Sequence, residues 1–181
     1  MLERVLPTAF ARLDSFEVRL CLPVNSAARH RAVRHYFAVV SRLGDGIAWY
    51  ALLALLPLVL GRSAIVPALH MAVTAAAGVG LYKVLKQWLL RERPFHSHRG
   101  VLAIVDPLDR YSFPSGHTLH AASFTVMIAH YFPGLLWIVV PFAGSVAISR
   151  VVLGLHYPSD VLAGGLIGWL LAATSLQVVL A

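Results

Sequence analysis

Charged residues lie beside a histidine inside an otherwise apolar part of this sequence. The segment Ser149–Asp160 places a cation (Arg150), an imidazole (His156) and a carboxylate (Asp160) between two long apolar runs. Charged groups in such surroundings cost on the order of several kcal/mol unless they are paired or take part in chemistry. We therefore treat this segment as the centre of a candidate site.

The residues around His156 predict a nucleophile that is held by a carboxylate. Pro158 favours the start of a helix, so Asp160 is expected in its first turn. A carboxylate there can reach one imidazole nitrogen and fix the tautomer, which leaves a free lone pair on the other nitrogen. His117, at a second expected helix start, can protonate a leaving alkoxide and later deprotonate water.

That second helix start also predicts a cradle for an anion. Pro114 is expected at the first helical position, so the backbone N–H groups of the three following residues point outward with the positive end of the helix dipole. Ser115 and His117 flank Gly116, which has no side chain to obstruct the approach of an oxyanion. The segment is typical of a phosphate-binding turn.

Three basic residues predict the cationic side of the same site. Lys86 and Arg93 are seven residues apart, so both should project from one face of a helix that stops at Pro94. Two neighbouring cations repel each other unless an anion joins them. Arg150 adds a planar, permanently charged fork that suits two phosphate oxygens.

The composition indicates an integral membrane protein. Of 181 residues, 59% are hydrophobic and 13% charged, and the mean hydropathy is +0.74. The formal charge is +7, but the basic residues are interleaved with apolar runs, which favours anionic lipid and anionic substrate over nucleic acid. The single Cys21 excludes an internal disulfide and a multi-cysteine metal site.

The expected fold is all-α: an integral membrane helical bundle with about five transmembrane helices. Residues 1–46 are expected to form amphipathic interfacial helices, and residues 47–181 the transmembrane domain. The expected spans are residues 47–60, 64–82 with a helical extension to 93, 118–132, 135–153 and 161–181. Alternating these spans across the bilayer brings one set of residues to a single face of the membrane: Lys86, Arg93, His117, Arg150, His156 and Asp160.

Three motifs occur in order within Leu85 to Leu166: Lys86-x6-Arg93-Pro94, Pro114-Ser115-Gly116-His117 and Ser149-Arg150-x5-His156-x3-Asp160. Together they resemble the signature of the type 2 phosphatidic acid phosphatase (PAP2) superfamily, which shares a helical core with vanadium haloperoxidases and bacterial acid phosphatases. The hydropathy points to the membrane-bound lipid phosphatases of that superfamily.

The resemblance implies a metal-independent phosphatase without a cofactor. It implies that His156 attacks phosphorus to form a phosphohistidine, that Asp160 orients His156, and that His117 is the general acid and then the base. It also implies a set of phosphate-holding residues: Lys86, Arg93, Ser115, Gly116 and Arg150. The expected substrates are a lipid phosphate or a polyprenyl diphosphate, namely phosphatidic acid, phosphatidylglycerophosphate or undecaprenyl diphosphate, and the sequence does not choose among them.

Other functions remain open at this point. The same intermediate would serve a lipid phosphotransferase, and the cationic site alone would serve a non-catalytic protein that binds or transports anionic lipid. A metal site is a further alternative, formed by His96, His98 and His120 with His117 or Asp160. The sequence does not indicate an oligomeric state.

The resemblance predicts a multi-pass protein of the bacterial inner membrane with an extracytoplasmic active site. The arginines of the N-terminal region favour the opposite, cytoplasmic, orientation under the positive-inside rule. Both orientations therefore remain open. Asp106 and Asp109 are expected to be solvated loop charges, with a role in shaping the entrance to the site as the alternative. Arg91 is expected to be a solvated charge, with attraction of an anionic headgroup as the alternative, and Asp45 is expected near the headgroups.

Overall fold

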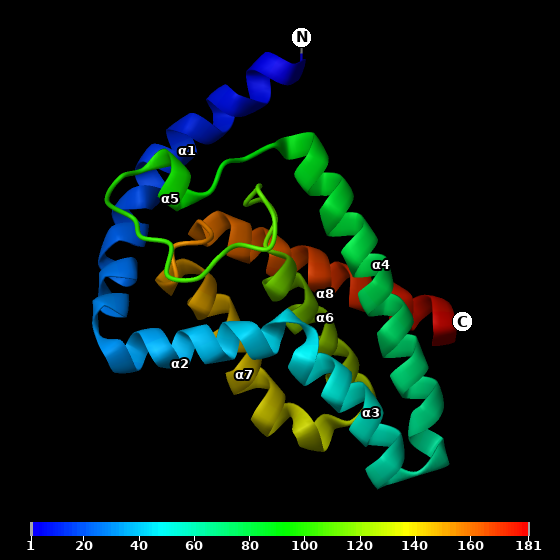
Figure 1. The fold of residues 1–181 in the computed structure, drawn as a ribbon. Coiled ribbons are helices and arrows are strands. Elements are labelled where there is room, and N and C mark those ends of the chain that lie inside the picture. The colour runs from blue at the N-terminus through cyan, green and yellow to red at the C-terminus, as the bar shows by residue number, and fades with distance from the viewer. Residues whose placement is uncertain (1, 181) are drawn as a thin grey trace.

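The computed structural model describes residues 2–180, and their side chains except at positions 2–9, 11 and 180. This part of the chain is helical and contains no strand (Figure 1). The helices are α1 (Leu2–Ser26), α2 (Arg31–Arg42), α3 (Ala48–Leu60), α4 (Ile65–Leu89), α5 (Pro94–Ser97), α6 (Gly116–Tyr131), α7 (Leu136–Val152) and α8 (Pro158–Leu180). Four short turns join them: η1 (Ala27–Arg29), the π-helical η2 (Leu43–Ile47), η3 (Arg62–Ala64) and η4 (Pro133–Leu135).

The prediction of a multi-pass helical membrane protein is confirmed. In the described chain, four stretches are long and apolar enough to cross a membrane: Arg31–Leu60, Arg62–Ser97, Pro133–Val152 and Pro158–Val179. The five expected runs correspond to α3, α4, α6, α7 and α8. The run that is missing from the four is α6, whose 16 residues extend only about 24 Å at 1.5 Å per residue.

Helix α6 is the central element of the bundle. It packs against α4, α7 and α8 (Figure 1). A Cβ atom at Gly168 of α8 would collide with the backbone carbonyl of Leu119, and the hydroxyl of Ser123 donates to the Gly168 carbonyl at 2.9 Å. The close approach of α8 to α6 therefore requires glycine at position 168. This contact fixes the relative position of α6 and α8, the two helices that begin at the candidate site.

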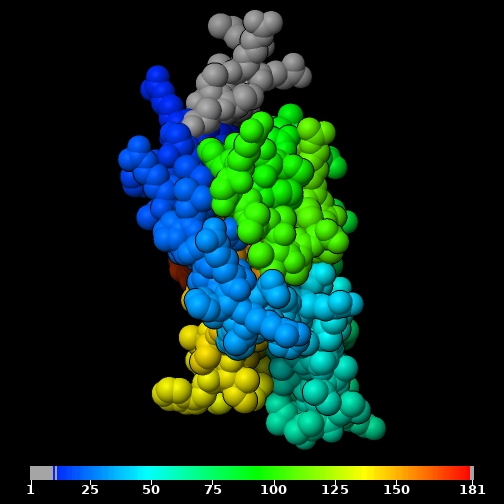
Figure 2. Space-filling model, turned by 60° about the vertical axis from the view of Figure 1, so that its left-hand side comes forward, coloured from blue at the N-terminus to red at the C-terminus, as the bar shows by residue number. Residues whose placement is uncertain are grey.

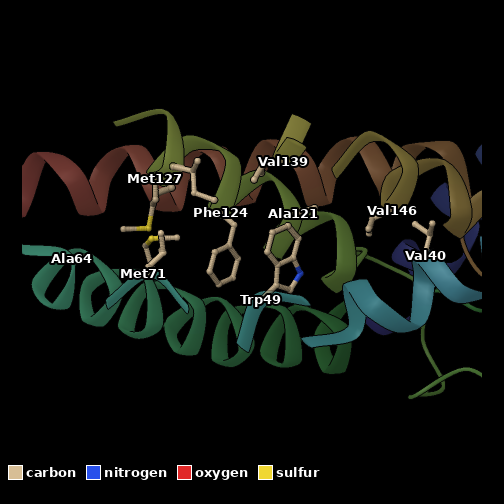
Figure 3. Close-up of a cluster of buried hydrophobic side chains, with 12 residues drawn as sticks. Val40, Trp49, Ala64, Met71, Ala121, Phe124, Met127, Val139 and Val146 are labelled. Carbon is tan, nitrogen blue, oxygen red and sulfur yellow. The ribbon is translucent and has the colours of Figure 1, made fainter. Parts of the chain in front are cut away.

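Large apolar side chains fill the space between α3, α4, α6 and α7. The indole of Trp49 stacks on Phe124, with ring centroids 4.6 Å apart and an interplanar angle of 7° (Figure 3). Figure 3 also shows Met71 and Met127 directed toward one another. These residues belong to one buried cluster, so the helices that carry the site are held by a continuous apolar core.

Helix α1 packs against the bundle at the polar end of the molecule. It contacts α7 and α8, and it buries Glu17, Cys21 and Asn25. The side-chain amide of Asn25 donates to the carbonyls of Leu102 and Val152, both at 2.9 Å. Figure 2 shows α1, in blue, beside the green segment that follows α4. The N-terminal region is thus joined to the loop that precedes α6.

The helix that carries Lys86 is shorter than predicted. Helix α4 ends at Leu89, because Leu90 adopts a left-handed conformation with φ of 48°. Arg93 is extended, as is usual for a residue before proline, with φ of −78° and ψ of 152°. The expectation that Lys86 and Arg93 share one helix face is therefore wrong, and other contacts must bring them together.

Candidate active site

A cavity of about 490 Å³ opens among α3, α4, α6 and α7 at the polar end of the bundle. Its polar wall contains most of the residues singled out by the three motifs: Lys86, Arg93, Gly116, His117, Arg150 and His156. Its other wall is apolar and includes Trp49, Leu53, Ala72, Ala75, Val79 and Phe124. The cavity thus joins a cationic pocket to an apolar pocket between helices.

His156 lies between α7 and α8 and is buried, with 2% of its surface exposed. Its Nδ1 atom is 3.5 Å from Oδ2 of Asp160, and its Nε2 atom is 3.3 Å from Nη1 of Arg93. Burial, followed by the charges of Arg93 and Arg150, lowers the pKa of His156 well below its ordinary value of 6.5. The imidazole is therefore neutral at neutral pH, which is the state that a nucleophile needs.

Asp160 lies in the first turn of α8, as the sequence predicts, and is fully buried. Its Oδ2 atom accepts a hydrogen bond from the Tyr157 backbone N–H at 2.9 Å, and its Oδ1 atom accepts one from Nη1 of Arg91 at 2.5 Å. These two bonds hold the carboxylate at the Nδ1 side of His156. The separation of 3.5 Å is an ion-pair distance and is longer than a hydrogen bond.

Arg91 is a buried structural cation, so the expectation of a solvated side chain is wrong. Only 2% of its surface is exposed. Besides Asp160, its guanidinium binds Asp14 and Glu17 of α1, each at 2.6 Å, and the hydroxyl of Ser159 at 2.7 Å. Three carboxylates share this one cation. The acidic residues of α1, three positions apart on one helix face, were the signal in the sequence that pointed to such a partner.

Lys86 and Arg93 meet at a third residue, Asp109 of the polar loop. Oδ1 of Asp109 is 2.7 Å from Nζ of Lys86 and 2.7 Å from Nη2 of Arg93, and its Oδ2 atom is 2.9 Å from the same Nζ. The side chain of Asp109 is 38% exposed. Asp109 is thus not a merely solvated charge, since its carboxylate forms ion pairs with both Lys86 and Arg93, two of the residues expected to hold phosphate.

The N-terminus of α6 differs in two details from the predicted cradle: the expectation that Pro114 is the first helical residue is wrong, because the helix begins at Gly116, and the N–H of Ser115 is not free. Ser115 is the N-cap residue, and its hydroxyl accepts from the Thr118 N–H at 3.4 Å. Its own N–H donates to the backbone carbonyl of Asp160 at 3.0 Å, so it is not available to an anion. Gly116 and His117 are the first helical residues, have no intrahelical acceptor for their N–H groups and line the cavity.

Arg150 lies in the last turn of α7 and is 3% exposed. One of its terminal nitrogens, Nη1, donates to the hydroxyl of Ser41 in α2. Its Nε atom has no hydrogen-bond partner among the residues whose side chains the structure describes. Arg150 therefore lines the cavity and has N–H donors that a bound anion can accept from.

His117 faces a carboxylate that the sequence reasoning did not assign to the site. Its Nε2 atom is 3.6 Å from Oδ1 of Asp45, and both residues line the cavity. Asp45 belongs to η2, the kinked turn between α2 and α3, which brings it to the cavity. The signal in the sequence was an acidic residue between two glycines, Gly44 and Gly46, at the start of an apolar run.

The histidines of the alternative metal site are not grouped together. His120 lines the cavity, whereas the ring of His98 packs against Tyr157 with centroids 6.3 Å apart. Within the described part of the chain, no three His, Cys, Asp or Glu residues are arranged to hold one metal ion.

Comparison with known proteins gives one family and a set of membrane enzymes. The family model described as PAP2 superfamily matches residues 67–181. The undecaprenyl-diphosphatase of Sulfolobus acidocaldarius is 29% identical over 140 residues, which cover 77% of this chain and 67% of that protein. The bacitracin transport permease protein BcrC of Bacillus licheniformis is 40% identical over 82 residues, which span only 39% of its length and 44% of this chain.

Two solved structures have the same fold. The Aquifex aeolicus LpxE structure matches with a TM-score of 0.76 and 27% identity, covering 88% of this chain and 93% of that one. A transmembrane PAP2-type phosphatidylglycerolphosphate phosphatase from Bacillus subtilis matches with a TM-score of 0.72 and 24% identity, covering 95% and 94%. The match extends beyond the motifs to nearly the whole helical arrangement.

Proposed function

This chain belongs to the PAP2 superfamily, and from that membership we propose that it is a membrane lipid phosphatase acting through a phosphohistidine intermediate. The observation that carries the proposal is the neutral, buried His156 beside Asp160, at the cationic end of a cavity whose other wall is apolar. The substrate is a lipid phosphomonoester or a lipid diphosphate.

The phosphate group binds between the cations and the N-terminus of α6. Lys86, Arg93 and Arg150 supply positive charge, and the backbone N–H groups of Gly116 and His117 supply further donors. Ser115 acts indirectly, because it caps α6 and joins it to the backbone of Asp160. The phosphate displaces the carboxylate of Asp109 from Lys86 and Arg93, so that both cations bind the phosphate instead.

In the first step His156 attacks phosphorus. The lone pair of Nε2 forms the N–P bond while the bond between phosphorus and the leaving oxygen breaks, and the protonated His117 gives its proton to that oxygen. Asp160 lies at Nδ1 and stabilises the positive charge that develops on the ring. The dephosphorylated lipid leaves as a neutral alcohol, or as a monophosphate when the substrate is a diphosphate.

In the second step water cleaves the phosphohistidine. The neutral His117 takes a proton from water as the new O–P bond forms, and the N–P bond breaks with its electron pair returning to Nε2 of His156. Inorganic phosphate leaves, and both histidines regain their starting protonation states. Neither step, as written, uses a metal ion or a cofactor.

The apolar wall of the cavity supports a lipid as the leaving group. Trp49 and Leu53 of α3 and Ala75 and Val79 of α4 line the same cavity as the cationic residues. The small residues on α4 leave room for a hydrocarbon chain. Phosphatidic acid, phosphatidylglycerophosphate and undecaprenyl diphosphate all combine an anionic head with such a chain, and two of the relatives are named for phosphatidylglycerophosphate and undecaprenyl diphosphate hydrolysis.

We further infer a location in the bacterial inner membrane, with residues 1–46 at the interface and residues 47–181 forming the phosphatase domain. The face of the membrane on which the active site opens is measurable. A cysteine added beside the exposed Gly100, in a variant whose buried Cys21 is replaced by alanine, reports by labelling in sealed vesicles whether the polar loop faces outward.

The function is tested by phosphate release from the three lipids. The detergent-purified protein is assayed in excess EDTA, with His156→Ala as the control. Release that survives the chelator and disappears in the variant supports the phosphohistidine route. Transfer of phosphate to a second lipid without release would establish a phosphotransferase, and lipid binding unaffected by His156→Ala, without turnover of any lipid, would establish a binding protein.

A further inference from the structure

We propose that Asp45 is a positioning residue for His117: its carboxylate orients the imidazole ring and stabilises the protonated form that gives a proton to the leaving oxygen. The inference rests on the proposed phosphatase function. Asp45 lies outside the three sequence motifs and outside residues 67–181, which the family model matches.

The geometry places the two side chains within ion-pair distance. Oδ1 of Asp45 is 3.6 Å from Nε2 of His117, and the contact joins the turn η2 to the first turn of α6. The side chain of His117 is 9% exposed and that of Asp45 is 38% exposed. Both line the same cavity, so the carboxylate is open to the space that a substrate enters.

The backbone around Asp45 is irregular and is held from both sides. Gly46 has a φ of 129°, a backbone conformation that residues other than glycine rarely adopt. A Cβ atom on Gly44 would lie 2.7 Å from a methyl group of Val146 in α7, and the carbonyl of Gly44 accepts from Nε1 of Trp49 at 3.1 Å. The backbone on the N-terminal side of Asp45 is therefore held at Gly44 by close packing and a buried hydrogen bond, and the backbone on its C-terminal side turns at Gly46.

Such a turn is unusual in a membrane helix. The backbone is kinked at Gly46 between α2 and α3, and irregular backbone at membrane depth is tolerated where it lines a cavity. Asp45 lies at the kink between the interfacial helix α2 and the apolar helix α3, within residues 31–60, one of the four stretches able to cross a membrane. Ionisable residues in such segments are costly and are usually retained for function.

The charges of the site explain why His117 needs a carboxylate. Lys86, Arg93 and Arg150 surround the same cavity and disfavour a further positive charge on a neighbouring imidazole. A general acid must nevertheless carry its proton when the first bond breaks. The negative charge of Asp45, facing Nε2, offsets this repulsion, and it does so independently of the charge brought by the substrate.

The rival explanation is that Asp45 only balances the charge of Arg150 and keeps the fold intact. The two explanations differ in their dependence on the leaving group. An alkoxide needs a proton from His117 to leave, whereas a nitrophenolate does not. Loss of a proton-donating role is therefore selective for alkyl substrates, and loss of a structural role is not.

The test compares two phosphate esters of matched chain length: dodecyl phosphate and a nitrophenyl phosphate that carries an alkyl chain. The full-length protein in detergent is assayed as wild type, Asp45→Asn, Asp45→Glu and Asp106→Asn, the last being a matched control at an exposed loop carboxylate. Steady-state kcat and KM are measured for the first ester, and the first-turnover release of nitrophenolate is measured for the second.

We expect Asp45→Asn to lower kcat for dodecyl phosphate by about 10- to 100-fold, with KM changed by less than about threefold, and to leave the first-turnover release of nitrophenolate unchanged. Asp45→Glu restores part of kcat, and Asp106→Asn behaves as wild type. An equal loss with both esters, or wild-type kinetics with both, overturns the role of Asp45. If the wild-type protein hydrolyses neither ester nor any of the three lipids, it is the phosphatase function that fails, and the inference fails with it.

Discussion

The guanidinium of Arg91 and the carboxylate of Asp160 are joined by a 2.5 Å hydrogen bond in the interior of the protein, where both side chains are fully buried. The same guanidinium is held by Asp14 and Glu17 of α1. The N-terminal helix therefore reaches, through one cation, the carboxylate that lies beside His156. This link is part of the structural support of the site, although none of the described side chains of α1 lines the cavity.

Replacing Arg91 by methionine leaves the buried charge of Asp160 without its partner. Breaking a buried pair in this way costs roughly 3 to 5 kcal/mol, so we expect a large loss of thermal stability together with loss of turnover. Thermal unfolding in detergent and phosphate release measure the two effects. Arg99→Met, at an exposed position of the following loop, is the control. Unchanged stability in Arg91→Met would show that the pair is not needed.

Replacing Asp160 by asparagine removes the charge that faces Nδ1 of His156 while keeping the size of the side chain. By analogy with other orienting carboxylates, the rate should fall by about 10²- to 10⁴-fold. Lipid binding should persist, because the cations at the opposite side of the imidazole are unchanged. Turnover and equilibrium binding of the same lipid separate the two effects, and near-normal turnover would contradict the role given to Asp160.

Replacing Asp109 by asparagine should strengthen phosphate binding. The carboxylate occupies Lys86 and Arg93 in the absence of substrate, and a phosphate must displace it. A partly exposed ion pair contributes up to about 1 kcal/mol, which corresponds to an approximately fivefold lower inhibition constant for inorganic phosphate. Inhibition of lipid hydrolysis by phosphate measures this constant, with Asp106→Asn as the control. Weaker inhibition would instead mean that Asp109 holds the two cations in their binding positions.

The lowered pKa of His156 predicts a dependence of stability on pH. The unfolded chain takes up a proton at this residue near its ordinary value of 6.5, whereas the folded protein does so only at lower pH, because of burial and the nearby charges of Arg93 and Arg150. This contribution to stability is therefore complete above pH 6.5 and is lost as the pH falls toward the folded pKa. The melting temperature should fall less between pH 7.5 and 5.5 in His156→Asn than in the wild type. An equal fall in both proteins would contradict the assignment.

Local sequence signals predicted the helices and some of the site contacts. The start of α8 at Pro158 and the place of Asp160 in its first turn follow from residues that are close in sequence. The contact of Arg91 with Asp14 and Glu17 joins residues more than 70 positions apart, and the acidic face of α1 indicates a basic partner without specifying which residue it is. Long-range packing decides such pairs, so sequence reasoning took Arg91 for a solvated charge.

Two other differences have the same origin. The left-handed conformation of Leu90 ends α4 early, and Lys86 and Arg93 then meet through Asp109 and not along a helix face. The sequence predicts a boundary after residue 46, but the close packing of Gly44 against Val146 of α7 joins residues about 100 positions apart, and the sequence does not display it. The motifs thus identified which residues form the cavity, while their partners came from the tertiary structure.

The 16-residue length of α6 has a consequence for the route of a lipid substrate. The helix extends about 24 Å, whereas the hydrocarbon layer of a typical bilayer is about 30 Å thick. Its two ends cannot both reach the headgroup level of an undeformed bilayer, and one of these ends carries the N–H groups proposed to bind phosphate. Because α4, α7 and α8 enclose α6, neighbouring helices and not lipid cover this short helix, so a lipid headgroup must enter between helices to reach the N-terminus of α6.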